Sequence, residues 1–249
     1  MSEDITEFLN AWPYTPGQPT VRLIRTSEGV EKIQIRLDLG VLQMNAEGRP
    51  DGQRPHGYES LLDYFEDEMD DAADQPPEER PKLSEDDCRS LRDEAAQYYH
   101  RYMALLVLED YVGVLRDATR NLRLLDFLAE HAETDADKES LADVRPHLMM
   151  IRARAVATQA VKDEEGKAAL VAIDLALEDV KRAFAEGGKP QAFDESPEVE
   201  MLRNMRQALA PKLPVSQKAE LKARLQKAIE EENYELAAIL RDELKQLKD

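Results

Sequence analysis

The chain contains a single cysteine, Cys88, so it cannot form a disulfide within itself. Aromatic residues make up only 6% of it, so Leu, Ala, Val, Ile and Met must build most of any core, and these favour packed helices. No apolar run approaches the roughly 18 residues that span a membrane. The N-terminus "MSEDITEFLN" also lacks the basic and apolar regions of a secretory signal. These absences predict a cytoplasmic protein that does not enter membranes.

Basic residues are also scarce relative to acidic ones. The chain has 33 Lys and Arg and 52 Asp and Glu, which gives a formal net charge of −19 at pH 7. Such a surface repels phosphate backbones and anionic lipid. Direct binding to nucleic acid is therefore not expected.

Signatures of catalysis are missing as well. The four histidines stand far apart, and none has another His or Cys at the spacing of a metal ligand: His56, His100, His131 and His147. The sequence contains no phosphate-binding "GxxxxGK[ST]" loop and no nucleophile elbow. Cys88 has two acidic neighbours, which oppose a reactive thiolate. We expect no enzyme activity, no metal and no cofactor.

Strand character is confined to the first part of the chain, residues 1–75. "TVRLIRTSEGVEKIQIRLDL" holds two runs around a turn in which Gly29 can adopt a positive φ. Apolar residues then alternate with polar ones from Ile33 to Leu39, which predicts a β-hairpin with one buried face. A lone hairpin is marginal in water. The expected cover is either the segment around Phe8 and Trp12 or "YESLLDYFEDEM".

A Gly-, Pro- and Arg-rich loop, residues 45–57, follows the hairpin. It is either a solvated connector or a binding loop in which Arg49, Arg54 and His56 meet an anion. An acidic run and two prolines come next, and they predict a domain boundary near residues 75–81.

Residues 84–210 read as helical throughout. Apolar residues recur at spacings of three and four, which predicts amphipathic helices. The expected helix boundaries are marked by capping, proline and glycine residues: Ser84 with Asp87, Asp110, Pro146, Gly187 with Gly188, and Ser196. Paired helices joined by short turns indicate an antiparallel bundle or a short solenoid.

One junction in this part, "ALLVLEDYVGVLRDATRNLRLLDFLAEH", resembles the helix junction of tetratricopeptide repeats. The resemblance implies helical hairpins that stack side by side. Successive pairs are here nearer about 50 residues than the 34 of that family, and its Trp and Gly positions are not clearly met.

Residues 216–249 read as a separate helical hairpin, preceded by the proline-containing linker "APKLPVS". Apolar stripes on its two arms face each other across "ENY". About nine large apolar side chains cannot offset the entropy of ordering such a short hairpin. We therefore expect it to pack on something else, and the linker before it suggests that this need not be its own domain.

The core of this hairpin, "AIEEENYELAAILRDEL", closely resembles the UVR motif of the excision-repair proteins UvrB and UvrC, which also occurs in some Clp-type ATPases. The resemblance implies protein–protein contact. The residues that it implicates, together with the apolar stripe of the first arm, are Leu225, Ile229, Tyr234, Leu236, Ala237, Leu240, Arg241 and Leu244. The helicase and nuclease segments of the repair proteins are absent from this sequence.

The sequence therefore predicts a mainly α-helical adaptor that recruits a partner, or a second copy, through residues 216–249. Two alternatives stay open. One is an accessory factor of nucleotide excision repair that contacts a UvrB- or UvrC-type protein, with the N-terminal arginines near DNA. The other is a regulator of a Clp-type protease system.

Overall fold

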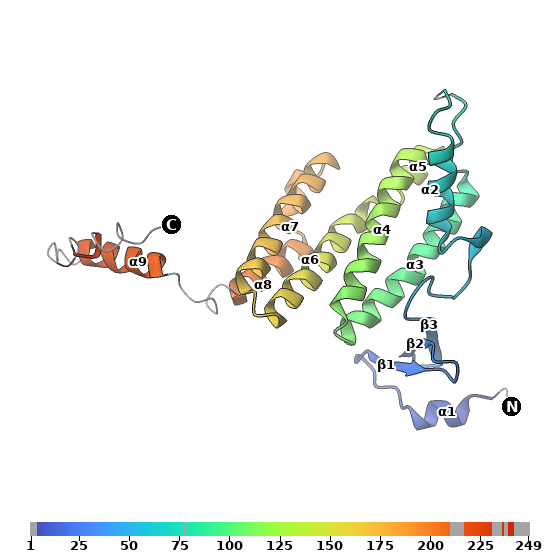
Figure 1. Ribbon diagram of the computed structural model, residues 1–249, viewed down its shortest axis with the longest axis horizontal. Coiled ribbons are helices and arrows are strands. Elements are labelled where there is room, and N and C mark those ends of the chain that lie inside the picture. The colour runs from blue at the N-terminus through green and yellow to red at the C-terminus, as the bar shows by residue number, and fades with distance from the viewer. Residues whose placement is uncertain (1–3, 77, 210–216, 231–235, 237–238, 242–249) are drawn as a thin grey trace. The chain divides into compact units, whose positions relative to one another are not determined.

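The computed structural model describes residues 4–76, 78–209, 217–230, 236 and 239–241. It divides into two compact units, residues 1–206 and 207–249. The boundary predicted near residues 75–81 lies inside the first unit. The described part is mainly helical with a small N-terminal sheet, as predicted (Figure 1).

The sheet is an antiparallel meander of three strands in the order β1-β2-β3. Its strands are β1 (Thr20–Arg25), β2 (Glu31–Arg36) and β3 (Val41–Asn45). The predicted hairpin is β1–β2, and its turn places Gly29 at φ 84°, a conformation that favours glycine. The third strand was not predicted: it lies between the end of the predicted hairpin and the predicted loop, and only Asn45 belongs to that loop.

The apolar alternation predicted for β2 holds only in part. Ile33 is fully buried, but Leu37 and Leu39 lie in the turn after the strand and are exposed. That turn is closed by a hydrogen bond from the backbone N–H of Leu37 to the carbonyl of Gly40. The chain reverses at Leu37, so the period of two cannot continue there. The expectation of an apolar face reaching Leu39 was wrong.

A row of polar side chains covers the other face of the sheet. Arg22 Nε donates to Gln34 Oε1 (2.8 Å), and Gln34 Nε2 donates to Gln43 Oε1 (2.7 Å). The Arg22 guanidinium lies 3.9 Å from the ring centroid of Trp12, close to α1 (Thr6–Ala11). The segment with Phe8 and Trp12 thus contacts the polar face of the sheet.

The helices of the first unit begin where the capping residues predict. Ser84 and Asp87 form a reciprocal capping box at α3, and Asp110 accepts from the N–H of Gly113 at α4. The helices of this unit from α2 onward, with the 3-10 turns η1 to η3, are α2 (Leu61–Asp71), α3 (Glu85–Val107), α4 (Tyr111–His131), α5 (Asp135–Glu139), α6 (Arg145–Lys162), α7 (Gly166–Glu186), α8 (Pro197–Leu209), η1 (Pro55–Gly57), η2 (Ala142–Val144) and η3 (Pro190–Phe193).

Consecutive long helices pack against one another: α3 on α4, α4 on α6, and α6 on α7 (Figure 1). This is the array of antiparallel hairpins that the sequence predicts. The helix α2, which contains most of "YESLLDYFEDEM", joins it instead of covering the sheet, because its Leu62 and Phe65 are buried among Leu91, Leu124 and other residues of α3 and α4.

The open end of the α3–α4 pair is closed by a short backbone bridge. The N–H of Leu83 donates to the carbonyl of His131 (2.9 Å), and the N–H of Glu133 donates to the carbonyl of Leu83 (3.1 Å). The residues just before α3 are thus fixed to those just after α4.

The second unit contains α9 (Gln217–Glu230), the first arm of the predicted hairpin. Residues 236 and 239–241, from the second arm, are also helical. In the described part of the chain, no helix has the length and apolar character that crossing a membrane requires.

Candidate functional site

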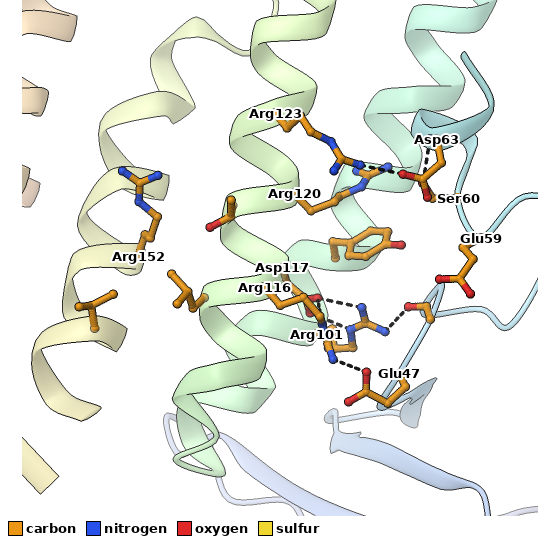
Figure 2. A pocket seen from close by; sticks show the side chains of 15 residues that line it. Glu47, Glu59, Ser60, Asp63, Arg101, Arg116, Asp117, Arg120, Arg123 and Arg152 are labelled. Carbon is orange, nitrogen blue, oxygen red and sulfur yellow. Dashed lines mark hydrogen bonds and ion pairs between the residues drawn. The ribbon is translucent and has the colours of Figure 1, made fainter. Parts of the chain in front are cut away.

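A buried ion pair joins α3, α4 and the loop after β3 (Figure 2). Arg101 donates from Nε and Nη2 to the two carboxylate oxygens of Asp117, at 2.7 and 2.8 Å. Its Nη1 donates to the carbonyls of Asn45 (3.2 Å) and Gly48 (2.6 Å). The Arg101 side chain is 1% exposed and that of Asp117 is not exposed at all. This pair therefore holds residues 45–48 against the helices.

Glu94 of α3 is a second buried carboxylate, and it contacts two arginines and two backbone N–H groups. It contacts Arg120 of α4 and lies 3.1 Å from Arg49 Nε. Its oxygens also accept from the backbone N–H groups of Leu61 (2.8 Å) and Leu62 (3.3 Å) at the start of α2. A carboxylate of α3 thus accepts hydrogen bonds from the N-terminal N–H groups of α2, where a negative charge is favoured.

A cavity of about 810 Å³ opens over these charges. Its walls come from α3, α4, α6 and the segments around residues 47–48 and 59–63. The charged side chains that line it are Glu47, Glu59, Asp63, Arg101, Arg116, Asp117, Arg120, Arg123 and Arg152. Arginines thus outnumber acids in the lining, although the chain as a whole is strongly acidic. These side chains stand far apart in the sequence, and the cavity was not predicted.

The three residues proposed for an anion-binding loop do not converge on one point. Arg49 is engaged by Glu94 and by Asp51 (3.4 Å). Arg54 lies 3.9 Å from Glu59, and the His56 ring stacks on Tyr64 at 4.1 Å. Each side chain thus has a different neighbour, and Arg49 already has two carboxylates. The anion site at this loop stays a prediction without support from the geometry.

Cys88 is fully buried, and this burial raises the pKa of its thiol to about 11. The neutral thiol is therefore the dominant form at neutral pH, and it is not a nucleophile. We expect Cys88 to react with Ellman's reagent only after unfolding in urea, when the thiol becomes exposed. Absorbance of the released chromophore measures this, and rapid stoichiometric reaction of the folded protein would contradict the buried position.

The residues predicted to bind a partner divide by their exposure. In the first arm Leu225 is half-buried and Ile229 is 47% exposed. In the second arm Leu236 is 37% exposed and Arg241 is exposed, but Leu240 is only 1% exposed.

Ala228 and Leu240 are the buried pair of this unit among the described residues, and Ile239 beside Leu240 is 55% exposed. Tyr234, Ala237 and Leu244 lie outside the described residues.

The model of the UvrB/uvrC motif, UVR, matches residues 216–249. This segment is similar to the UVR motif. The match confirms the resemblance found in "AIEEENYELAAILRDEL", and it covers the C-terminal hairpin alone. The UVR segment lies within the second unit. No curated protein and no solved structure matches the chain.

Proposed function

We propose that the protein is a non-enzymatic adaptor whose UVR segment binds another protein or a second copy of itself. The match of residues 216–249 to the UVR motif carries the proposal. UVR motifs occur in UvrB and UvrC, so a UvrB- or UvrC-type repair protein is the first partner to test.

The exposure of the apolar side chains supports a contact surface on this segment. Ile229 and Ile239 keep about half of their surface in water, although Ala228 and Leu240 next to them are buried. Exposed branched aliphatic residues at such positions gain free energy when a partner covers them. The segment also has seven basic and eight acidic residues, so it is nearly neutral in a chain of −19. A partner therefore meets little electrostatic repulsion there.

The test replaces both exposed isoleucines, Ile229→Asp with Ile239→Asp. We expect the double variant to lose the complex, with an affinity lowered by at least about a hundredfold, because two charges enter an apolar contact. The measurement is affinity purification from native lysate with mass spectrometry, together with light scattering of the purified chain to detect self-association. Leu240 is unsuitable for this purpose, since an aspartate there would unfold the hairpin.

The matched control is Val171→Asp. Val171 is 58% exposed on α7, in the first unit, so the same kind of charge is introduced away from the UVR segment. Circular dichroism should show both variants folded. Equal recovery of all proteins, and an equal mass in solution, from wild type and from the isoleucine variant would contradict the proposal.

The non-enzymatic part of the proposal rests on how the charges of the first unit are used. Its buried acids Glu94, Asp117 and Asp137 each hold an arginine, which is a structural role and not that of a general base.

A further inference from the structure

Three hydrogen-bond donors in the wall of the large cavity have no partner among the described residues. Nε of Arg120 is buried, whereas the hydroxyl of Tyr98 and the guanidinium of Arg152 remain accessible to water. Arg120 is 9% exposed and its Nε is buried, so water does not satisfy that donor fully. Burial raises the pKa of Tyr98 to about 12, so its hydroxyl is protonated and able to donate. A buried donor is normally paired, so the unpaired Nε of Arg120 is unusual, and the two accessible donors of the same cavity are free to meet an acceptor.

Arg152 differs from the other arginines of the cavity. Arg101, Arg116 and Arg123 each contact a carboxylate, but Arg152 is half-buried on α6 and contacts no carboxylate in the described part of the chain. Next to it on the wall are Leu115 and Val156, which are 36% and 37% exposed. A cation beside exposed aliphatic groups suits a ligand that has both a negative charge and an apolar part.

The cavity extends across both sides of α4. Figure 2 shows Arg152 on α6 at one side, and Arg120 and Arg123 directed toward Ser60 and Asp63 at the other. A ligand that occupies both sides of α4 has to be extended.

The acidic side chains of the lining restrict the class of ligand further. Glu47 and Glu59 are 80% and 74% exposed at the edge of the cavity. A phosphate backbone has a charge at every nucleotide and would be repelled by them and by the net charge of the chain. A peptide can place one carboxylate at Arg152 and keep the rest of its length neutral or apolar.

We propose that this cavity binds an extended, mostly apolar peptide segment of a partner protein, with a single carboxylate of that segment accepting from Arg152. The site lies in the first unit and is independent of the UVR segment. The protein would thus have two separate contact surfaces, one helical and nearly neutral and one lined with arginine.

The test uses the full chain and a fluorescein-labelled octapeptide with one central Glu among Leu and Ser residues, followed by fluorescence anisotropy at low salt. We expect saturable binding, and binding about tenfold weaker for Arg152→Gln, because a charge-assisted hydrogen bond is lost. Tyr98→Phe, which removes only the hydroxyl, should weaken binding by a few-fold. The same peptide with Gln in place of Glu should bind far more weakly.

The matched control is Arg154→Gln. Arg154 is an exposed arginine on the same helix that does not line the cavity, so its loss changes the net charge equally. It should leave the affinity within about twofold of wild type, as expected for a screened surface charge. No saturable binding, or equal weakening by the two arginine variants, would overturn the proposal. Displacement of the peptide by a single-stranded DNA oligonucleotide, with binding of the DNA itself sensitive to Arg152→Gln, would overturn the assignment to a peptide.

Discussion

Replacing Asp117 by Ala is expected to lower the free energy of unfolding by about 3–5 kcal/mol, because it leaves a buried guanidinium without its counter-charge. Arg101 would keep only two carbonyl oxygens, those of Asn45 and Gly48, and Arg116 would lose one of its carboxylates. Urea unfolding followed by circular dichroism measures the change.

The double variant Arg101→Met with Asp117→Leu separates the loss of the pair from the loss of one partner. It removes both charges and fills the space with apolar groups, so it should be much closer to wild type than Asp117→Ala. If Asp117→Ala unfolds at the same urea concentration as wild type, the pair is not buried as described.

Replacing Glu94 by Ala should have an effect of similar size, about 3–5 kcal/mol, since one carboxylate serves four donors. Arg120 would lose its acid partner, Arg49 would keep only Asp51, and the N–H groups of Leu61 and Leu62 would lose their acceptor. Hydrogen exchange should show α2 losing protection before α6 and α7, because the first turn of α2 depends directly on Glu94.

Glu94→Gln is the control for charge. It keeps an acceptor for the α2 N–H groups but not the ion pair, so it should protect α2 better than Glu94→Ala. Uniform loss of protection over all helices in both variants would argue against a local role of Glu94 at α2.

Helix positions followed from the sequence because their signals are local. Ser84 with Asp87 and Asp110 cap their helices through groups three residues away, so a short window of sequence contains the whole interaction. The UVR motif was recognised for the same reason, since its hairpin is one continuous stretch of the chain.

The third strand was missed because pairing creates it. Val41–Asn45 is short and stands between Gly40 and the Gly- and Pro-rich loop, so its sequence alone resembles a connector. Its partner β2 supplies the hydrogen bonds that make it a strand. The exposed Leu37 and Leu39 have the same origin, since the tight turn before β3 takes them out of the sheet.

The cavity lined by arginines was missed because charged residues in a helix are normally assigned to its solvent-exposed face. Arg101, Asp117, Glu94 and Arg120 are buried only because α3 and α4 bring opposite charges together across their interface. One signal was present in the sequence: Arg101 and Asp117 lie at equal sequence distances from Glu109, at the turn between the helices. Such positions face each other in an antiparallel hairpin, so opposite charges there indicate a pair.

The bridge between Leu83 and Ala132 also affects how the first unit can open. A pair of antiparallel helices joined only by its turn frays from the free end, one helical turn at a time. Here the turn at Leu108–Asp110 fixes one end, and two backbone hydrogen bonds with the capping box of Ser84 fix the other. Partial melting that begins at a helix end is thereby suppressed, and α3 and α4 should separate in a single cooperative step.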